Sequence, residues 1–288
     1  MTSRRSPRPP LGGEERPPAP PAGRPGRDLR LALGQVRYTN LAFWRNPAAA
    51  FFTFAFPLMF LVIFTVLLGN GSTCLRPSPS GCLLEVRTST FYVASISAFS
   101  VITACYTNIA MSVTFARDRG VLKRIRGTPL PGWAYLFGRI AHAVLVAVAL
   151  VAISAAFGRL AYGARLPLST LGPLALTLAV GAATFCALGL AITAAIPNAD
   201  ASPAIVNASI LPLLFVSDVF IPLENPPAWL DVLARVFPVR HFVEGMLAAY
   251  FPSAGGSGLR PGDLLVVAGW GLAGLALAVR YFSWEPRR

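Results

Sequence analysis

The side chains best suited to a specific interaction lie in one short basic segment, residues 115–131, which reads FARDRGVLKRIRGTPLP. Its cations surround an apolar trio, Val121, Leu122 and Ile125. Gly127-Thr128-Pro129 then ends the helical pattern. Membrane orientation would explain the cations but not the trio, whereas a docking surface for another protein explains both. The candidate docking residues are Arg117, Asp118, Val121, Leu122, Lys123, Arg124, Ile125, Arg126, Thr128 and Pro129.

No catalytic or metal-binding constellation accompanies this segment. The histidines are His142 and His241, and neither has a second His or Cys at ligand spacing. The sequence contains no G-x-S-x-G nucleophile elbow and no G-x-x-x-x-G-K-[ST] phosphate loop. We therefore expect neither an enzyme nor a protein that binds a metal, a cofactor or ATP by itself.

The four cysteines fall into two pairs with different surroundings. Cys105 and Cys186 lie inside apolar stretches, where a thiol packs as a small apolar group. Cys74 and Cys82 lie in a segment rich in Pro and Gly. A disulfide between them is plausible if that segment faces an oxidising compartment, but spacing leaves both the bridged and the reduced form open.

Six long apolar stretches must position these residues. Each is near the roughly 20 residues that a helix needs to cross a bilayer, and a spanning segment must satisfy its own backbone polar groups. The predicted fold is therefore an all-α integral membrane protein with six transmembrane helices. The predicted spans are 48–69, 89–115, 135–157, 169–196, 203–222 and 262–282.

Composition and charge support a membrane protein. The 288 residues are 55% hydrophobic and 13% charged, with net charge +13; soluble domains carry about 25% charged residues. Such a charge could indicate nucleic acid, but its distribution favours membrane orientation and contact with anionic lipid. With both termini inside, nine arginines up to Arg45, six basic residues in 116–139 and three near the C-terminus, or 18 of 25, face the cytoplasm.

The remaining segments are not expected to span. Residues 1–27 are dominated by Pro, Gly and Arg and are predicted to be a disordered cytoplasmic tail. Residues 28–46 have helical apolar spacing and predict an amphipathic helix on the inner leaflet, the alternative being a short cytoplasmic helix without contacts. Residues 218–261 are apolar but divided by prolines, which favours a re-entrant pair of short helices in the outer leaflet.

The second predicted span is unusually rich in polar side chains. This favours a helix that faces other helices or a polar path, while bonding of the hydroxyls back to their own helix is the alternative. The candidate substrate-path residues are Ser100, Thr103, Thr107 and Asn108, together with Asp218 at the end of the fifth span.

Residues 28–285 resemble the membrane subunit of a type-2 ATP-binding-cassette (ABC-2) exporter, the class that includes drug-resistance, polysaccharide and lipid export permeases. The resemblance rests on Arg45-Asn46-Pro47 before the first span, on the 119–129 motif, and on the motifs after the fifth span. Those later motifs supply the hairpin residues Pro222, Pro227, Trp229, Phe237 and Pro238. Many members have Gly where this chain has Asp218. Asp218 either lines a substrate path or is hydrated at the membrane boundary, and we favour hydration.

The resemblance implies a specific function. It implies a multi-pass permease of the bacterial inner (plasma) membrane that exports an amphiphilic small molecule such as a drug, or a lipid-linked product. It also implies two separate ATP-binding-cassette ATPase subunits, which hold ATP and Mg, docked on the 117–129 region. A second permease copy would complete a homodimer or heterodimer. The alternative is a membrane-anchoring or regulatory protein without transport activity.

Overall fold

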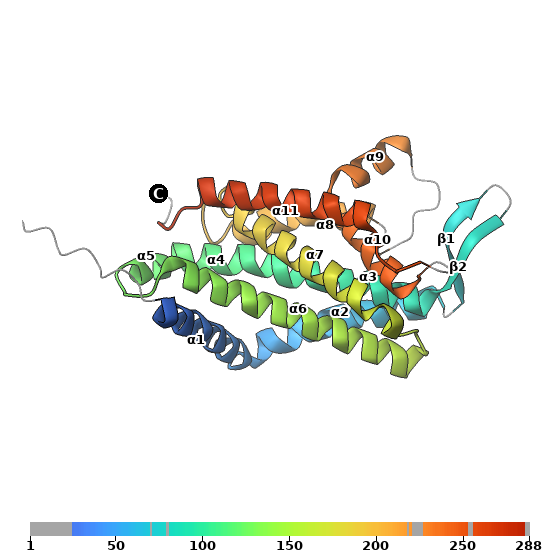
Figure 1. Ribbon diagram of the computed structural model, residues 1–288, viewed down its shortest axis with the longest axis horizontal. Helices are drawn as coiled ribbons and strands as arrows, with labels where there is room; N and C mark the ends of the chain where they lie inside the picture. Colours follow the sequence, from blue (N-terminus) through green and yellow to red (C-terminus); the bar gives the residue numbers. More distant parts are fainter. Residues whose placement is uncertain are drawn as a thin grey trace, which may run out of the picture.

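The computed structural model describes residues 25–69, 71–78, 81–217, 219–220, 227–252 and 256–285. These residues form a bundle of helices with one two-stranded antiparallel hairpin (Figure 1). The predicted all-α membrane fold is confirmed, and the hairpin is an addition that the sequence does not predict. Most of the predicted tail, residues 1–24, lies outside the described residues, as do Asp218 and Pro222.

Five helical segments are long and apolar enough to cross a bilayer. Each coincides with a predicted span, and the ends differ by a few residues. They are α2 (Pro47–Leu67); Thr88–Asp118, formed by α3 (Thr88–Ile102), η1 (Thr103–Thr107) and α4 (Asn108–Asp118); α6 (Gly132–Tyr162); η2 (Leu168–Thr170) with α7 (Leu171–Ile192); and α11 (Pro261–Tyr281).

The predicted span 203–222 contains a shorter helix, α8 (Ser202–Val216). Its 15 residues extend about 22 Å, less than the roughly 30 Å of a hydrocarbon core. The apolar residues beyond it are used for packing: Phe220 stacks on Phe64, and its carbonyl accepts a hydrogen bond from Tyr92 Oη at 3.1 Å. The described chain therefore has five helices of sufficient length, and the predicted count of six is not confirmed.

The segment Thr88–Asp118 is the centre of the bundle. Its most apolar part is 72% buried, against 22% for α2 and for α11. The neighbouring helices approach it closely where side chains are small; a Cβ added to Gly189 of α7 would lie 2.7 Å from the Tyr106 carbonyl oxygen. The outer helices present apolar side chains on their other faces, which suits contact with lipid.

The N-terminal helix α1 (Pro25–Trp44) lies along α6 (Figure 1). It begins within the predicted tail, three residues before the predicted start, and Pro is favourable at the first position of a helix. Its protein-facing side includes the fully buried Ala32, Gln35 against Gly138, and Phe43, which packs on the core beside His142. Leu29 and Leu33 are exposed, so the first half of this helix presents its apolar side chains away from the bundle.

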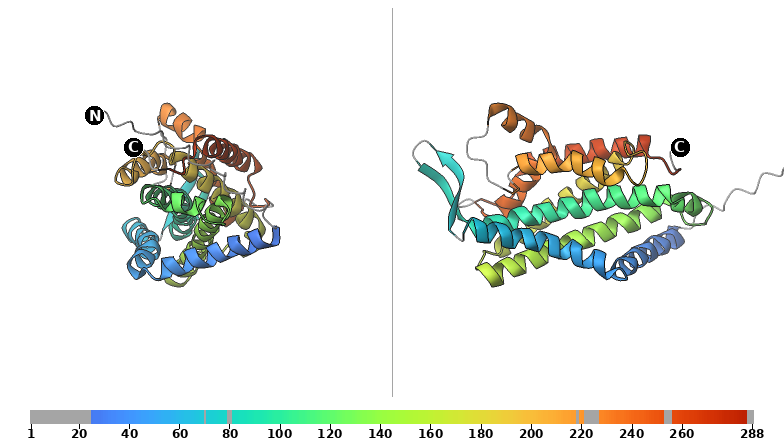
Figure 2. Two further views of the ribbon diagram at one scale, coloured as in Figure 1. Left: turned by 90° about the vertical axis from the view of Figure 1, so that its left-hand side faces the viewer. Right: turned by 180° about the vertical axis from the view of Figure 1, so that it is seen from behind.

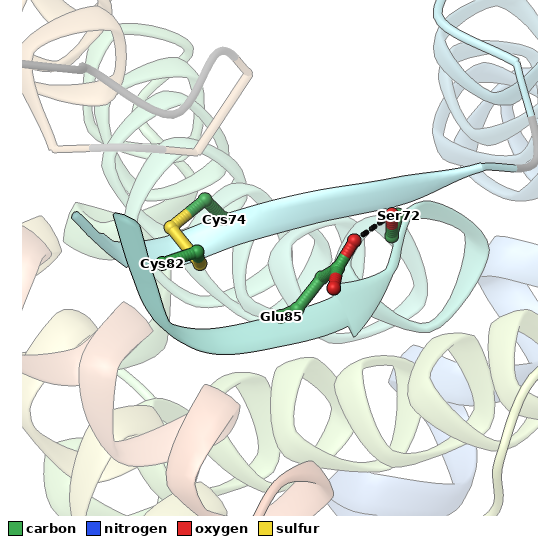
Figure 3. The surroundings of a disulfide bond; sticks show 4 residues. All are labelled: Ser72, Cys74, Cys82 and Glu85. Atoms are coloured by element: carbon green, nitrogen blue, oxygen red, sulfur yellow. Dashed lines mark hydrogen bonds between the residues drawn. A yellow bond between two sulfur atoms is a disulfide. The ribbon is translucent and has the colours of Figure 1, made fainter. Parts of the chain in front are cut away.

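The strands β1 (Ser72–Ser78) and β2 (Gly81–Arg87) pair in antiparallel register, Ser72 opposite Arg87 and Ser78 opposite Gly81. Cys74 and Cys82 form a disulfide across the pair, with their α-carbons 5.7 Å apart, and Ser72 is hydrogen-bonded to Glu85 (Figure 3). The hairpin lies at one end of the bundle, which we call the hairpin end (Figure 1). The short helix α5 (Val121–Arg126) and the C-terminal segment lie at the opposite end, the α5 end.

Two short helices, α9 (Ala228–Val236) and α10 (Pro238–Tyr250), precede α11. Phe237 at their corner stacks on Trp270, whose Nε1 donates to the Val236 carbonyl at 2.8 Å. Trp270 lies nine residues into α11, so the corner lies about 14 Å from the start of that helix. The two helices differ in environment. Trp229 of α9 is 68% exposed, whereas the apolar residues Phe242, Val243 and Met246 of α10 are fully buried and belong to the core of the bundle, where α10 packs on α3, α7 and α11.

Candidate functional site

The predicted docking segment lies at the α5 end, where α4 stops and α5 begins. Gly120 makes the change of direction with φ +70°, a left-handed conformation that costs other residues energy. Its N–H bonds the Arg117 carbonyl at 3.0 Å, and the N–H of Arg119 bonds that of Phe115 at 3.1 Å. These bonds close α4, so α5 leaves at an angle set by one glycine.

The outward surface of α5 is strongly basic. Lys123, Arg124 and Arg126 are exposed in its last turn, and cations are favourable at that end of a helix. Thr128 and Pro129 are exposed next to them, and Thr128 Oγ1 donates to the Ile125 carbonyl at 2.7 Å. We call the exposed residues Val121, Lys123, Arg124, Arg126, Thr128 and Pro129 the α5 surface.

The apolar trio does not face outward as a unit. Leu122 is fully buried, Ile125 is half-buried against the core of the bundle, and only Val121 is exposed, at 37%. Residues three apart share one face of a helix, and here that face packs on the chain itself. The expectation that Leu122 contacts a partner is therefore corrected: it anchors α5 to its own bundle, and an aspartate there would act through folding.

Arg117 is also inside the protein rather than on the α5 surface. Its side chain is 1% exposed, with Nη1 2.9 Å from the Thr193 carbonyl oxygen and Nη2 2.5 Å from that of Ile196. The Thr193 carbonyl is at the C-cap of α7, where unpaired carbonyls and the helix dipole favour a cation, and the Ile196 carbonyl lies in the turn that follows. Asp118 Oδ2 accepts a hydrogen bond from the Ala199 N–H at 3.1 Å. The end of α4 is thus bound to the turn that connects α7 and α8.

The segment after α11, which contains Trp284, packs against the start of α6. A Cβ added to Gly132 would lie 2.5 Å from the indole of Trp284, so that glycine leaves room for the ring. The guanidinium of Arg126 lies 5.9 Å from the centre of the same indole, within cation–π range. Sequence reasoning missed Trp284, because a single aromatic residue after the last span carries no periodic signal.

Two of the predicted polar-path residues form hydrogen bonds within their own helix. Ser100 Oγ donates to the Ile96 carbonyl and Thr103 Oγ1 to that of Phe99, at 2.7 and 2.8 Å, so the alternative interpretation holds for both. Thr107 and Asn108 are half-buried beside them. The five residues Thr103–Thr107 form a π-helix, a geometry that is frequent at functional sites.

Comparison with known proteins decides what this arrangement belongs to. The model of the ABC-2 type transporter family matches residues 35–251, most of the chain. The chain belongs to the ABC-2 type transporter family. The match includes the α4–α5 corner, the central helix and the α9–α10 pair.

Two relatives of the ABC-2 chain have similar lengths of alignment but different coverage. The probable multidrug ABC transporter permease YbhR of Escherichia coli strain K12 is 27% identical over 190 residues, 62% of this chain and 50% of the relative. The putative transport permease ycf38 of Porphyra purpurea is 28% identical over 223 residues, 75% of this chain and 72% of the relative. The chain therefore spans about half the length of YbhR.

Towards the hairpin end, the ABC-2 chain contains an ion-pair network that the sequence analysis missed. Arg240 of α10 lies 2.9 Å from Asp231 of α9 and 3.1 Å from Glu244. Arg260, just before α11, bonds Glu244 at 2.5 Å and Asp263 at 2.7 Å. The i,i+4 spacing of Arg240 and Glu244 was a visible signal, but the pairs between helices depend on how the helices fold together.

His241 adds a second connection between the same helices. Its Nδ1 lies 2.7 Å from Asp263 Oδ1 and its Nε2 2.8 Å from the Arg235 carbonyl oxygen, so it joins α9, α10 and α11. Among the residues that the structure describes, no three His, Cys, Asp or Glu side chains converge as metal ligands would. Arg235 of α9 also lies 2.8 Å from Asp231, so three arginines face three carboxylates in this network, which contributes cohesion between the helices.

Proposed function

We propose that this chain is the membrane permease of an ATP-driven exporter that moves an amphiphilic small molecule or a lipid-linked product out of the cytoplasm. The observation that carries the proposal is the α5 surface, an exposed basic patch on a helix that is rigidly joined to the rest of the bundle. Family membership supports the same role, and the similarity to YbhR, a probable multidrug permease, favours a small amphiphile.

Energy would enter through the α5 surface. Two ATP-binding-cassette ATPase subunits, which hold ATP and Mg, would dock there, one on each copy of a permease homodimer or heterodimer. The chain's single lysine is Lys123, and it does not follow a glycine, so the sequence has no phosphate loop of its own. The energy for export would therefore come from ATP hydrolysis by the partner subunits.

The buried arginine gives the docking surface a route to the spans. A force that moves α5 acts on the end of α4, and Arg117 and Asp118 pass it to the α7–α8 turn through three hydrogen bonds. Two packed helices joined by such bonds move together more readily than separately. We propose that α8, which is short and lightly packed, changes position when the ATPase subunits close.

Two independent observations support an orientation in a bacterial inner membrane with α5 on the cytoplasmic side. The disulfide lies at the hairpin end, and disulfides persist in oxidising compartments. The α5 end holds the basic segment and the described C-terminal residues, in agreement with the positive-inside distribution. The α9–α10 pair would then enter the outer leaflet and return to the outer side.

The test is co-purification with a candidate ATP-binding-cassette ATPase, followed by hydrolysis measured with and without exported compounds. The triple variant Lys123→Glu, Arg124→Glu and Arg126→Glu should recover about tenfold less ATPase, because reversed charges on a docking rim slow encounter and repel a complementary surface. Arg159→Glu, an exposed substitution at the end of α6 remote from α5, is the matched control. Equal ATPase recovery by the triple variant and wild type, both correctly inserted, would reject the α5 surface as the dock.

A further inference from the structure

A pocket of about 540 Å³ lies between α7, α8 and α11, and the start of α10 closes one end of it. Its walls include Phe185 of α7, Leu213 of α8, and Trp270 and Leu277 of α11. Figure 2 shows α8 and α11 on the same side of the bundle, opposite α1. This volume is within the range of roughly 300–1,000 Å³ that is typical of sites for drug-sized ligands.

The chemistry of the lining selects a neutral ligand. None of the described residues that line the pocket is Asp, Glu, Lys, Arg or His, and most are aliphatic or aromatic. Moving an unpaired charge into such surroundings is strongly unfavourable, whereas an apolar body gains from leaving water. The occupant is therefore largely apolar and uncharged.

One polar feature gives the pocket a direction. Tyr106, presented by the π-helix η1, places its Oη 2.7 Å from Ser209 Oγ of α8. Ser209 Oγ donates to the Val206 carbonyl at 2.7 Å, so its hydroxyl hydrogen is in use and Tyr106 supplies the hydrogen between the two side chains. What remains for a ligand are oxygen lone pairs, which accept a hydrogen bond. A complementary ligand brings one donor, such as a hydroxyl or an amide N–H.

The pocket reaches the outer surface of the bundle between α8 and α11. Leu277 and Tyr281, which line it, are 50% and 53% exposed. Both lie on α11, a candidate membrane span, so the surface onto which the pocket opens meets lipid. A ligand can thus enter from the bilayer without crossing water.

We propose that this pocket binds a neutral, largely apolar molecule with a single hydrogen-bond donor, and that it is where the exported compound is taken from the bilayer. The second part rests on the proposed function. Of the polar-path residues that the structure describes, Ser100, Thr103, Thr107 and Asn108, none lines the pocket, which the second span reaches through Tyr106.

Photolabelling of the purified full-length chain in lipid nanodiscs tests the binding site. The probe is hexadecanol that carries an alkyl diazirine, compared with its methyl ether, which lacks the donor, and with its trimethylammonium analogue, which is charged. The alcohol should label peptides from α7, α8 and α11, the ether should label about fivefold less, and the ammonium compound should not label the pocket. The double variant Tyr106→Phe and Ser209→Ala, which removes both acceptor oxygens, should abolish the difference between alcohol and ether.

A matched pair of substitutions on α8 separates occupancy of the pocket from general effects. Leu213→Trp fills the pocket and should lower labelling roughly tenfold, because a close-packed site cannot admit both the indole and the probe. Leu211→Trp, two residues away on a 42% exposed side chain outside the lining, should leave labelling unchanged. Equal labelling of the two variants, or equal labelling by alcohol and ammonium probes, would overturn the proposed site.

A transport assay with the cognate ATPase distinguishes an exported compound from resident lipid. Leu213→Trp should reduce ATP-dependent export at least tenfold while Leu211→Trp retains it. Wild-type export by Leu213→Trp, with labelling competed away by added phospholipid alone, would overturn the assignment to the exported compound. If neither the wild type nor the variants exports any compound or binds an ATPase, the proposed function fails, and the labelling results still decide whether the pocket binds a neutral donor.

Discussion

The two ends of the molecule use arginine in opposite ways. At the α5 end, Arg117 is buried on backbone carbonyls, while the exposed Lys123, Arg124 and Arg126 form no ion pair with any carboxylate among the described residues. Near the hairpin end, Arg240 and Arg260 are paired with acids on neighbouring helices. The first arrangement leaves charge available to a partner, and the second consumes it in holding three helices together.

The comparison teaches that net charge alone says little about a membrane protein's surfaces. A backbone carbonyl cannot be lost by substitution, so a bond from Arg117 to Thr193 and Ile196 depends on one side chain only. An ion pair such as Arg240–Asp231 depends on two. The two ends should therefore respond differently to substitution, and the predictions that follow run from the largest expected effect to the smallest.

Arg117→Met should have the largest effect. It leaves the Thr193 carbonyl at the end of α7 and the Ile196 carbonyl in the following turn without their charged donor. Bonds to charged groups contribute about 1.5–3 kcal/mol each, so we expect a loss of roughly 3 kcal/mol. Thermal unfolding in detergent measures stability, and export per ATP hydrolysed measures coupling. Arg119→Met, two residues away and exposed, is the control. Identical unfolding temperatures of the two variants would contradict a role for Arg117 in holding α4 to the turn between α7 and α8.

Arg240→Gln should have an intermediate effect. Its side chain is 15% exposed and contacts two carboxylates, which the substitution leaves partly buried with weaker partners, so we expect a loss of about 2 kcal/mol. Arg235→Gln, on an arginine that is 66% exposed, should cost no more than about 1 kcal/mol. Both variants should recover ATPase at the wild-type level. A loss of ATPase binding by Arg240→Gln alone would contradict the claim that only the charges at the α5 end bind the partner.

Gly120→Ala should have the smallest effect on stability. No atom lies within 4 Å of the added Cβ, so the cost comes from φ +70° alone, about 1 kcal/mol. Gly127→Ala, at φ −84° with its Cβ in ordinary contact, should be neutral or slightly stabilising. Hydrogen exchange of α5 amides would show the difference locally. Equal exchange in the two variants would indicate that α5 does not depend on the conformation at Gly120.

The placement of the site shows how far local patterns reach. The basic segment and its end at Gly127-Thr128-Pro129 were predicted, because these residues follow one another in the sequence, whereas the corner at Gly120 was not. The inward direction of Leu122 was not, since an apolar residue in a basic segment fits an external partner as well as the chain's own core. Tyr106 and Ser209 are 103 residues apart, and nothing in either neighbourhood indicates the other.

The sequence by itself located the five helices that are long enough to cross a membrane, because crossing hydrocarbon requires a long run of apolar residues, and that requirement is local. It also determined the excess of cations at one end and the possibility of a Cys74–Cys82 bridge. Only the tertiary structure decided which polar groups are partners: Arg117 with the α7 carbonyls, Arg240 with Asp231, and Tyr106 with Ser209. A buried donor must find an acceptor somewhere in the bundle, but which one depends on the packing of helices distant in sequence.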